Sequence, residues 1–194
     1  MARFRALLAP RADERVLDVG GTPWFWLKSG LESRVTLLNL NTSGVTAANA
    51  AQFTFVEGDG CALPLADASF DVVFSNSAIE HVGTWARQEA FAREALRVGR
   101  RVWVQTPARE FFIEPHLIAP FIHWLPRGWQ RRLVRHFTVR GWFERPDAAA
   151  VEAFLDEVRL LTFAEMSALF PGCTIVRERF LGLTKSYIAV RTAS

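Results

Sequence analysis

The chain has 194 residues, of which half are hydrophobic and 22% are charged, and its formal net charge is +3 at pH 7. This composition excludes a disordered chain and predicts a single domain that spans residues 1–194. The two cysteines, Cys61 and Cys173, form neither a zinc-ligand spacing nor a disulfide framework, so we expect no metal site and a reduced, cytoplasmic setting.

The first informative segment is residues 16–23, where an apolar run ends in Asp18 and is followed by two glycines and Thr-Pro. This order predicts a strand near 15–19, a tight turn, and a helix near 23–29 that ends at Gly30. Free N–H groups at the start of that helix suit a carboxylate or phosphate. Because the strand begins so early, we expect almost no N-terminal segment to cover the sheet.

The rest of the chain alternates between strand and helix signals. Short, β-branched apolar runs predict buried parallel strands, and the capping-box pair Thr162 and Glu165 predicts a helix that runs to about Phe170. The expected strands are near 34–40, 53–57, 70–76 and 101–106, with a helix near 86–98 and a final hairpin of strands near 173–182 and 185–191. The predicted fold is α/β and Rossmann-like, with a mostly parallel seven-stranded sheet, helices on both faces, and a crevice at the carboxyl ends of the strands.

Two common nucleotide-binding patterns are absent from the chain. The G-x-G-x-x-G spacing of dinucleotide-binding folds does not follow the first strand, and no Gly-Lys-Ser/Thr of a Walker loop occurs. Instead, several segments in chain order resemble the class I S-adenosylmethionine-dependent methyltransferases of the type 11 kind. These segments are residues 16–23, 35–40, 58–65, 69–77, 78–82 and 102–107. The chain departs from the family where Thr22 and Trp24 replace glycines and where Asn39 replaces an acid.

The resemblance implies a site for S-adenosylmethionine. Asp18 would order the glycine loop and bind the amino group of the methionine part, Asn39 would hold the ribose less tightly than an acid would, and Asp59 would accept from the adenine amino group. Asn41 is a nearby substitute for Asn39. The candidate cofactor-binding residues are Asp18, Gly20, Gly21, Thr22, Asn39, Leu40, Asp59, Gly60, Cys61, Asn76 and Ser77.

Three residues are candidates for catalysis. His81 follows the fourth strand, and His116 lies about ten residues after the fifth, where Glu114 could orient it. A structural role is the alternative for each: a core histidine for His81, and a salt bridge or helix cap that anchors the insertion for Glu114 and His116.

Residues 108–160 are too long for a bare loop, so we expect a helical lid that binds the methyl acceptor. Within this insertion, residues 121–145 carry six arginines and one glutamate. Trp129, Leu133 and Phe137 share one helical face there. Three interpretations remain open: a packed helix with a solvated basic face, contact with an anionic membrane or a lipid-linked acceptor, and nucleic-acid binding. No segment is long and apolar enough to span a membrane.

The predicted activity is methyl transfer to a small-molecule or saccharide- or lipid-linked acceptor, with oxygen as the expected acceptor atom. The alternatives are a methyltransferase-like protein that binds S-adenosylmethionine without catalysis, and an RNA methyltransferase. The sequence gives no oligomeric state.

Overall fold

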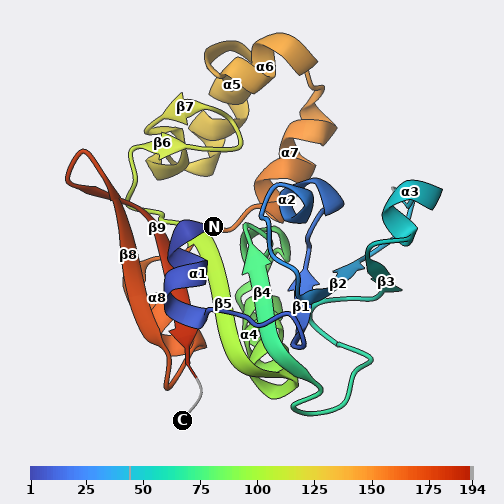
Figure 1. Ribbon diagram of the computed structural model, residues 1–194. Coiled ribbons are helices and arrows are strands. Elements are labelled where there is room, and N and C mark those ends of the chain that lie inside the picture. Colours follow the sequence, from blue (N-terminus) through green and yellow to red (C-terminus); the bar gives the residue numbers. More distant parts are fainter. Residues whose placement is uncertain (44, 193–194) are drawn as a thin grey trace.

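The structure, a computed structural model, describes residues 1–43 and 45–192 (Figure 1). A seven-stranded sheet with the order β3-β2-β1-β4-β5-β9-β8 forms its centre. The strands are β1 (Arg15–Val19), β2 (Arg34–Asn39), β3 (Thr54–Glu57), β4 (Phe70–Asn76), β5 (Gly99–Pro107), β8 (Thr174–Phe180) and β9 (Leu183–Arg191). Strands β1 to β5 pair in parallel, whereas β9 is antiparallel to both β5 and β8. The predicted sheet, with a hairpin at one edge, is confirmed.

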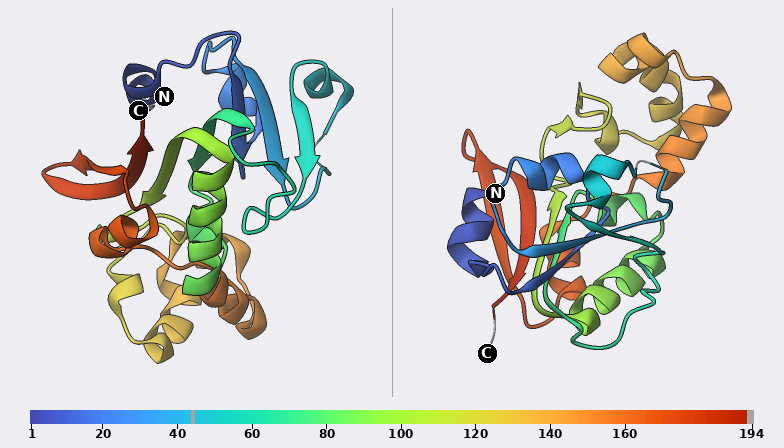
Figure 2. Two further views of the ribbon diagram at one scale, coloured as in Figure 1. Left: turned by 90° about the horizontal axis from the view of Figure 1, so that it is seen from below. Right: turned by 45° about the vertical axis from the view of Figure 1, so that its right-hand side comes forward.

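Helices cover both faces of the sheet (Figure 2). Helices α4 (Trp85–Val98) and α8 (Phe163–Leu169) contribute to one hydrophobic cluster, which contains the buried Leu17 of β1. Helices α1 (Ala2–Leu8) and α2 (Pro23–Leu27) contribute to a second cluster with the neighbouring Val16. Successive residues of a strand point to opposite faces, so β1 anchors both layers.

The expectation of almost no N-terminal cover is wrong. Helix α1 lies against the sheet, and its Phe4 is fully buried, with its ring 4.9 Å from the ring of Phe74 and 5.5 Å from that of Trp103. The helix spans fewer than two and a half turns, so tertiary packing rather than local propensity holds it in place. Its packing partners, Phe74 and Trp103, are far away in the sequence, which is why the segment carried no clear helix signal.

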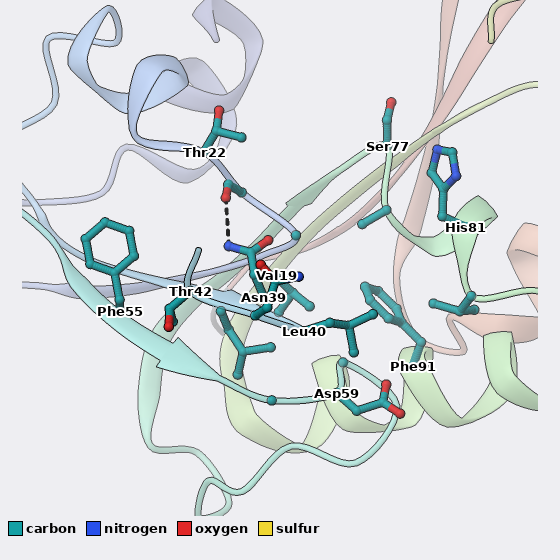
Figure 3. Close-up of a pocket in the computed structure, with 18 of the residues that line it drawn as sticks. Val19, Thr22, Asn39, Leu40, Thr42, Phe55, Asp59, Ser77, His81 and Phe91 are labelled. Carbon is teal, nitrogen blue, oxygen red and sulfur yellow. Dashed lines mark hydrogen bonds between the residues drawn. The ribbon is translucent and has the colours of Figure 1, made fainter. Parts of the chain in front are cut away.

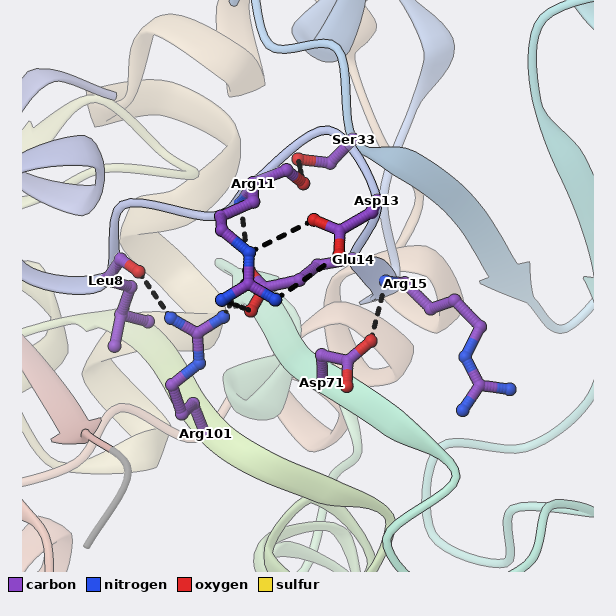
Figure 4. Close-up of polar contacts among 8 residues, drawn as sticks. All are labelled: Leu8, Arg11, Asp13, Glu14, Arg15, Ser33, Asp71 and Arg101. Carbon is purple, nitrogen blue, oxygen red and sulfur yellow. Dashed lines mark hydrogen bonds and ion pairs between the residues drawn. The ribbon is translucent and has the colours of Figure 1, made fainter.

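Polar contacts fasten the segment between α1 and β1 to the end of the sheet opposite the strands' carboxyl ends (Figure 4). The guanidinium of Arg101 bonds Glu14, with 2.5 Å between Nη2 and Oε2, and also donates to the carbonyl oxygen of Leu8. The backbone N–H of Arg15 donates to Asp71 over 2.9 Å. These contacts fix where the first strand starts, and therefore where its carboxyl end delivers the glycine turn.

The insertion between β5 and α8 begins and ends at one point of the sheet. Ala108 and Leu161 form an isolated parallel bridge, and the N–H of Arg109 donates to the carbonyl oxygen of Leu161 over 3.0 Å. Between them lie β6 (Ile113–Glu114), β7 (Ala119–Pro120), the 3-10 turn η2 (Ile122–Trp124), α5 (Arg127–Phe137), α6 (Val139–Glu144) and α7 (Ala148–Glu157). This lid has a small hydrophobic cluster of its own, which includes Leu117, Val134 and Leu155. The lid stands beyond the carboxyl ends of the strands in Figure 1.

The helical face that Trp129, Leu133 and Phe137 share is not the main packing face of the basic lid helix. In α5 the buried residue is Val134, whereas Trp129 is 57% exposed and Phe137 is 69% exposed. The partners of α5 are α6 and α7 rather than the body of the protein. Its charge is also partly neutralised, because Arg131 bonds Glu152 and Arg127 bonds Asp156.

Two smaller features differ from expectation. Helix α2 ends at Leu27, and the Thr22 hydroxyl makes no capping hydrogen bond, although Thr22 does precede the helix in an extended conformation. A further helix, α3 (Ala47–Ala50), follows β2 and was not predicted. In the described residues, no helix has the length and apolar character needed to cross a membrane.

Candidate functional site

A cavity of about 640 Å³ lies at the carboxyl ends of β1, β2 and β4 (Figure 3). The strand order reverses between β1 and β4, which is the position where open α/β sheets bind ligands. Its lining includes eight of the predicted cofactor residues, namely Gly20, Gly21, Thr22, Asn39, Leu40, Asp59, Gly60 and Ser77. Asn41 lines it as well.

The two glycines of the first turn are required by the protein's own packing. Gly20 has φ +83°, and a Cβ there would lie 2.7 Å from the Cβ of Ala78. A Cβ on Gly21 would lie 1.7 Å from Oδ2 of Asp18. Because these two residues have no side chains, the turn packs closely on β1 and on the segment after β4. The cavity wall there is formed by backbone atoms.

Asn39 joins the end of β2 to this glycine turn. Its Nδ2 donates a 3.0 Å hydrogen bond to the carbonyl oxygen of Gly21, which is the dashed line in Figure 3. Among the described residues, no donor reaches its Oδ1. Asn39 thus offers the cavity one free acceptor, while Leu40 beside it is 71% exposed and offers an apolar surface.

Asp59 lies across the cavity and is held by its neighbours. Its carboxylate accepts from the backbone N–H of Cys61 over 2.9 Å and from Nη2 of Arg87 over 3.0 Å. The Cys61 bond, followed by Arg87, lowers the pKa of Asp59, so this group is a carboxylate at neutral pH. Arg87 was not predicted; it comes from α4 and lines the cavity too.

Three predicted cofactor residues lie outside this cavity. Asp18 is 2% exposed and accepts a 2.6 Å hydrogen bond from Nε1 of Trp26, so it supports the turn from behind instead of facing a ligand. Cys61 is buried under Asp59, and its thiol donates to the carbonyl oxygen of Arg87. Asn76 faces a different cavity.

That second cavity, of about 620 Å³, adjoins the first at Ser77, which lines both. Ser77 has φ +57°, a backbone conformation that non-glycine residues seldom adopt. Its N–H donates to the carbonyl oxygen of Gln105, and its hydroxyl lies 3.2 Å from Oε1 of the same residue. Six aromatic residues from α1, α2, the sheet and the lid line this cavity: Phe4, Phe25, Phe74, Trp103, Phe111 and Phe180.

The structure brings the three predicted catalytic residues together. His81, in the 3-10 turn η1 (Ile79–His81), lines the first cavity, and its ring meets the ring of His116 edge to face with 4.6 Å between centroids. Nδ1 of His116 lies 2.7 Å from Oε1 of Glu114. Nδ1 of His81 lies 3.1 Å from Oε1 of Glu157, at the end of α7.

Glu80, which belongs to the segment 78–82 but was not predicted as a site residue, completes this cluster. Its side chain is fully buried, and its Oε1 lies 3.9 Å from Nε2 of His116. Burial raises the pKa of Glu80. Burial acts to lower the pKa of His116, but its bond to Glu114 and the charges of Glu114 and Glu80 outweigh this, so that pKa is raised. The one available signal was an acid next to His81 in an otherwise apolar segment.

The chain is similar to known methyltransferases. A family model described as a methyltransferase domain matches residues 17–101. Among curated proteins, the chain is similar to the ubiquinone/menaquinone biosynthesis C-methyltransferase UbiE of Dinoroseobacter shibae, at 37% identity over 50% of this chain and 44% of that protein. It is also similar to the protein of the same name from Paracoccus denitrificans, at 29% identity over 90% of this chain and 69% of that protein. The chain spans less than half the length of the Dinoroseobacter shibae protein.

Solved structures share the fold at low identity. An S-adenosylmethionine-dependent methyltransferase from Mesorhizobium loti superimposes with a TM-score of 0.58 at 20% identity, over 98% of this chain and 96% of that one. One from Methanosarcina mazei does so with a TM-score of 0.55 at 14% identity, over 95% of each chain. Both likenesses extend beyond residues 17–101 to the hairpin and the lid region.

Proposed function

Because the chain belongs to the class I S-adenosylmethionine-dependent methyltransferases, we propose that it transfers a methyl group to a small hydroxylated aromatic molecule. The observation that carries this proposal is the pair of cavities that adjoin at Ser77. One has the position and polar groups for the cofactor, and the other has aromatic walls and a volume typical of small-molecule sites. A third cavity, between the lid and the segment of the body at Gly83 and Thr84, shares no lining residue with the first.

The residues of the first cavity fit the cofactor. Oδ1 of Asn39 is free to accept from a ribose hydroxyl, and Leu40 and Phe91 offer apolar contact to a flat base. Asp59 already accepts from Arg87, and its remaining lone pairs can accept from an exocyclic amino group. The backbone of Gly20 and Gly21 lines the cavity without side chains. When bound, S-adenosylmethionine supplies an electrophilic methyl group on a sulfonium.

The chain's contribution to the transfer is alignment, exclusion of water and removal of a proton. Methyl transfer forms a bond from the acceptor oxygen or ring carbon to the methyl carbon, while the carbon–sulfur bond breaks and its electron pair stays on sulfur. Holding the two reactants in line accounts for several kcal/mol of such a barrier, on the order of 7–11 kcal/mol at most. The proton of the acceptor hydroxyl leaves toward His81, which lines the first cavity and contacts the ring of His116, itself paired with Glu114.

The acceptor class rests on the second cavity and on the relatives. Phe111 and Ile113 from the lid line this cavity together with Phe25 and Trp103 from the body, so the lid encloses the acceptor, as its position predicts. Polar groups at Ser77, Gln105 and Lys185 can orient a hydroxylated ring. The names of the curated relatives indicate methyl transfer to carbon, whereas the sequence favours methyl transfer to oxygen. A phenolic acceptor can be methylated at its oxygen or at a ring carbon.

The test has two stages. Calorimetry should detect S-adenosylhomocysteine binding, and the ligand should raise the melting temperature, while NADH and ATP should give much smaller shifts. Labelled S-adenosylmethionine is then incubated with a panel of mono- and dihydroxylated aromatic compounds, and mass spectrometry assigns O- or C-methylation. Absence of binding would remove the cofactor site; binding with no transfer to any aromatic acceptor would favour a binding protein without catalysis.

The outer surface of the lid also favours contact with an anionic membrane. Trp129, Phe137, Trp142 and Phe143 are between 57% and 85% exposed. Arg132 and Arg135 of α5 are exposed and make no ion pair with any described residue. Exposed aromatic rings among arginines suit a lipid headgroup region, where an apolar acceptor would be delivered.

A further inference from the structure

Three ligand-type side chains meet where the lid touches the body. Glu80 and His81 come from the turn η1 that follows β4, and His116 comes from the lid between β6 and β7. One oxygen of Glu80 and one ring nitrogen of each histidine all lie within 4.8 Å of one another. Two imidazoles and one carboxylate form a donor set that divalent transition metals favour.

The buried carboxylate of Glu80 indicates a ligand for this cluster. Its Oε2 accepts a 2.9 Å hydrogen bond from the hydroxyl of Thr106, but its Oε1 has no hydrogen-bond partner among the described residues. The side chain is fully buried, and a carboxylate oxygen without a partner in such a place is costly. The nearest cationic group available to it is His116, whose Nε2 lies 3.9 Å away and which is charged only when protonated.

Both histidines are already oriented as metal ligands usually are. Nδ1 of His116 faces the carboxylate of Glu114, and Nδ1 of His81 faces that of Glu157. A carboxylate accepts from Nδ1–H and so fixes the tautomer in which Nε2 carries the free lone pair. Glu114 is itself held by the backbone N–H of Leu117 over 2.5 Å. The cluster therefore has the carboxylate–histidine support that commonly surrounds protein metal sites.

We propose that Glu80, His81 and His116 bind a divalent transition-metal ion, with Zn²⁺ as the best match to the donor set. Bonds of about 2.0–2.2 Å place tetrahedral ligand atoms roughly 3.3 Å apart, so the side chains must close in by about 1 Å on binding. Three protein ligands leave a fourth position for water or an acceptor oxygen. The spacing of the two cysteines predicted no metal site, and these three ligands come from two segments that only the fold brings together.

Such an ion would connect the lid to the wall of the cofactor cavity. His116 is the lid's ligand, and His81 lines the cavity of about 640 Å³. Metal binding would thus fix the lid over the crevice independently of whether cofactor is bound. The inference concerns the ion and not the methyl acceptor. A bound ion would occupy Nε2 of His81 and of His116, so these rings take up the acceptor's proton only in the metal-free protein.

The test uses the full-length chain, stripped with a chelator and titrated with ZnCl₂ by calorimetry. We expect one tight Zn²⁺ site per chain, and Mg²⁺ should bind at least 100-fold more weakly because imidazole ligands do not suit it. Glu80→Gln keeps the shape and the bond from Thr106, and it should weaken Zn²⁺ binding more than 10-fold, as should His116→Ala. His136→Ala removes an exposed histidine of α5 and should bind Zn²⁺ like the wild type.

A variant at an exposed residue keeps the test informative if the Glu80 or His116 variants fail to fold. Glu157 is 57% exposed and its carboxylate pairs with His81, so Glu157→Gln should fold normally and still weaken Zn²⁺ binding about 10-fold or more, the usual cost of losing a carboxylate behind a ligand. Co²⁺ should give a visible spectrum that Glu80→Gln abolishes. Unchanged Zn²⁺ affinity in Glu80→Gln and Glu157→Gln, or no stoichiometric uptake by the wild type, would overturn the inference. Parallel titrations with S-adenosylhomocysteine keep this result separate from that of the proposed function.

Discussion

The indole nitrogen of Trp26 donates a 2.6 Å hydrogen bond to Oδ2 of Asp18, inside the protein and behind the cofactor cavity. The same carboxylate occupies the space that a side chain at Gly21 would need. The acid of the first motif thus controls the shape of the glycine turn through helix α2 instead of through a ligand. We infer that Asp18 is a positioning residue for the proposed cofactor site.

Asp18 should make stability depend on pH. Burial raises its pKa to about 7, above the ordinary 3.8, so the fold prefers its neutral form. Its contribution to stability is therefore largest at low pH and is lost as the pH rises from about 4 through 7. Asp18→Asn, which stays neutral and can still accept from Trp26, should melt several degrees higher than the wild type at pH 8, with little difference near pH 5. An equal shift of melting temperature at both pH values would contradict this assignment.

Asn39 should hold the ribose. Asn39→Ala removes the free acceptor and the bond to Gly21, and should weaken S-adenosylhomocysteine binding by about 1–2 kcal/mol, or roughly 5- to 30-fold in Kd. Asn39→Asp should bind about as well as the wild type, because a charged acceptor offsets the lost bond to Gly21. Calorimetry measures the S-adenosylhomocysteine affinity of the wild type and of both Asn39 variants, with Asn41→Ala as the matched control. If Asn41→Ala rather than Asn39→Ala weakens binding, the ribose lies on the neighbouring side chain.

Phe180 should contribute to acceptor binding and not to cofactor binding. It lines the aromatic cavity while remaining 53% exposed, so Phe180→Ala should leave the fold intact. We expect KM for the aromatic acceptor to rise about 5- to 10-fold, since the ring loses apolar contact worth roughly 1–1.5 kcal/mol. Leu181→Ala, at the exposed tip of the same hairpin, should change nothing. A change in S-adenosylhomocysteine affinity with unchanged acceptor KM would place the acceptor elsewhere.

His116 should serve the acceptor side of the reaction. His116→Ala should lower kcat on an aromatic acceptor by about 100-fold or more, the usual scale of a lost proton-transfer group, and change S-adenosylhomocysteine affinity less than 3-fold. Glu114→Gln should give a smaller loss, because the ring keeps a hydrogen-bond acceptor. Should His116→Ala instead abolish cofactor binding in folded protein, the lid would belong to the cofactor site.

The lid should bind anionic vesicles through its unpaired charges. Replacing Arg132 and Arg135 by Gln should lower binding to vesicles that contain phosphatidylglycerol by about 30-fold, on the order of 1 kcal/mol per lost charge near the surface. Added salt should weaken wild-type binding. The control is the charge-matched pair Arg100→Gln and Arg179→Gln, on the exposed surface of the body. Identical sedimentation of both double variants with vesicles would remove the membrane contact and leave the cofactor and acceptor sites untouched.

Local signals explain which parts of this molecule were predictable. The strands β1, β2, β4 and β5 have apolar runs that end in glycine, proline or polar residues, and their order alone places Asn39 and Asp59 on one edge. The capping box at Thr162 and Glu165 forms as predicted, with Thr162 accepting from the Glu165 backbone and Glu165 from that of Thr162. In each case the residues that decide the conformation lie within a few positions of one another.

Long-range contacts explain the rest. Phe4 is buried only because Phe74 and Trp103 lie behind it, so α1 had no local signature. The packing face of α5 could not be predicted locally, because α6 and α7, and not the body, cover it. The orientation of Asp18 toward Trp26, and the meeting of Glu80 with His116, depend on tertiary placement that no short window of sequence contains.

The single bridge between Ala108 and Leu161 has a consequence for how such a protein can change. The lid leaves and rejoins the sheet at one place and packs around its own small core, so a different insertion could be spliced between these two positions without disturbing the strands. New acceptor specificity would then arise by exchange of this cassette, while the glycine turn and the floor of the cofactor cavity are inherited unaltered.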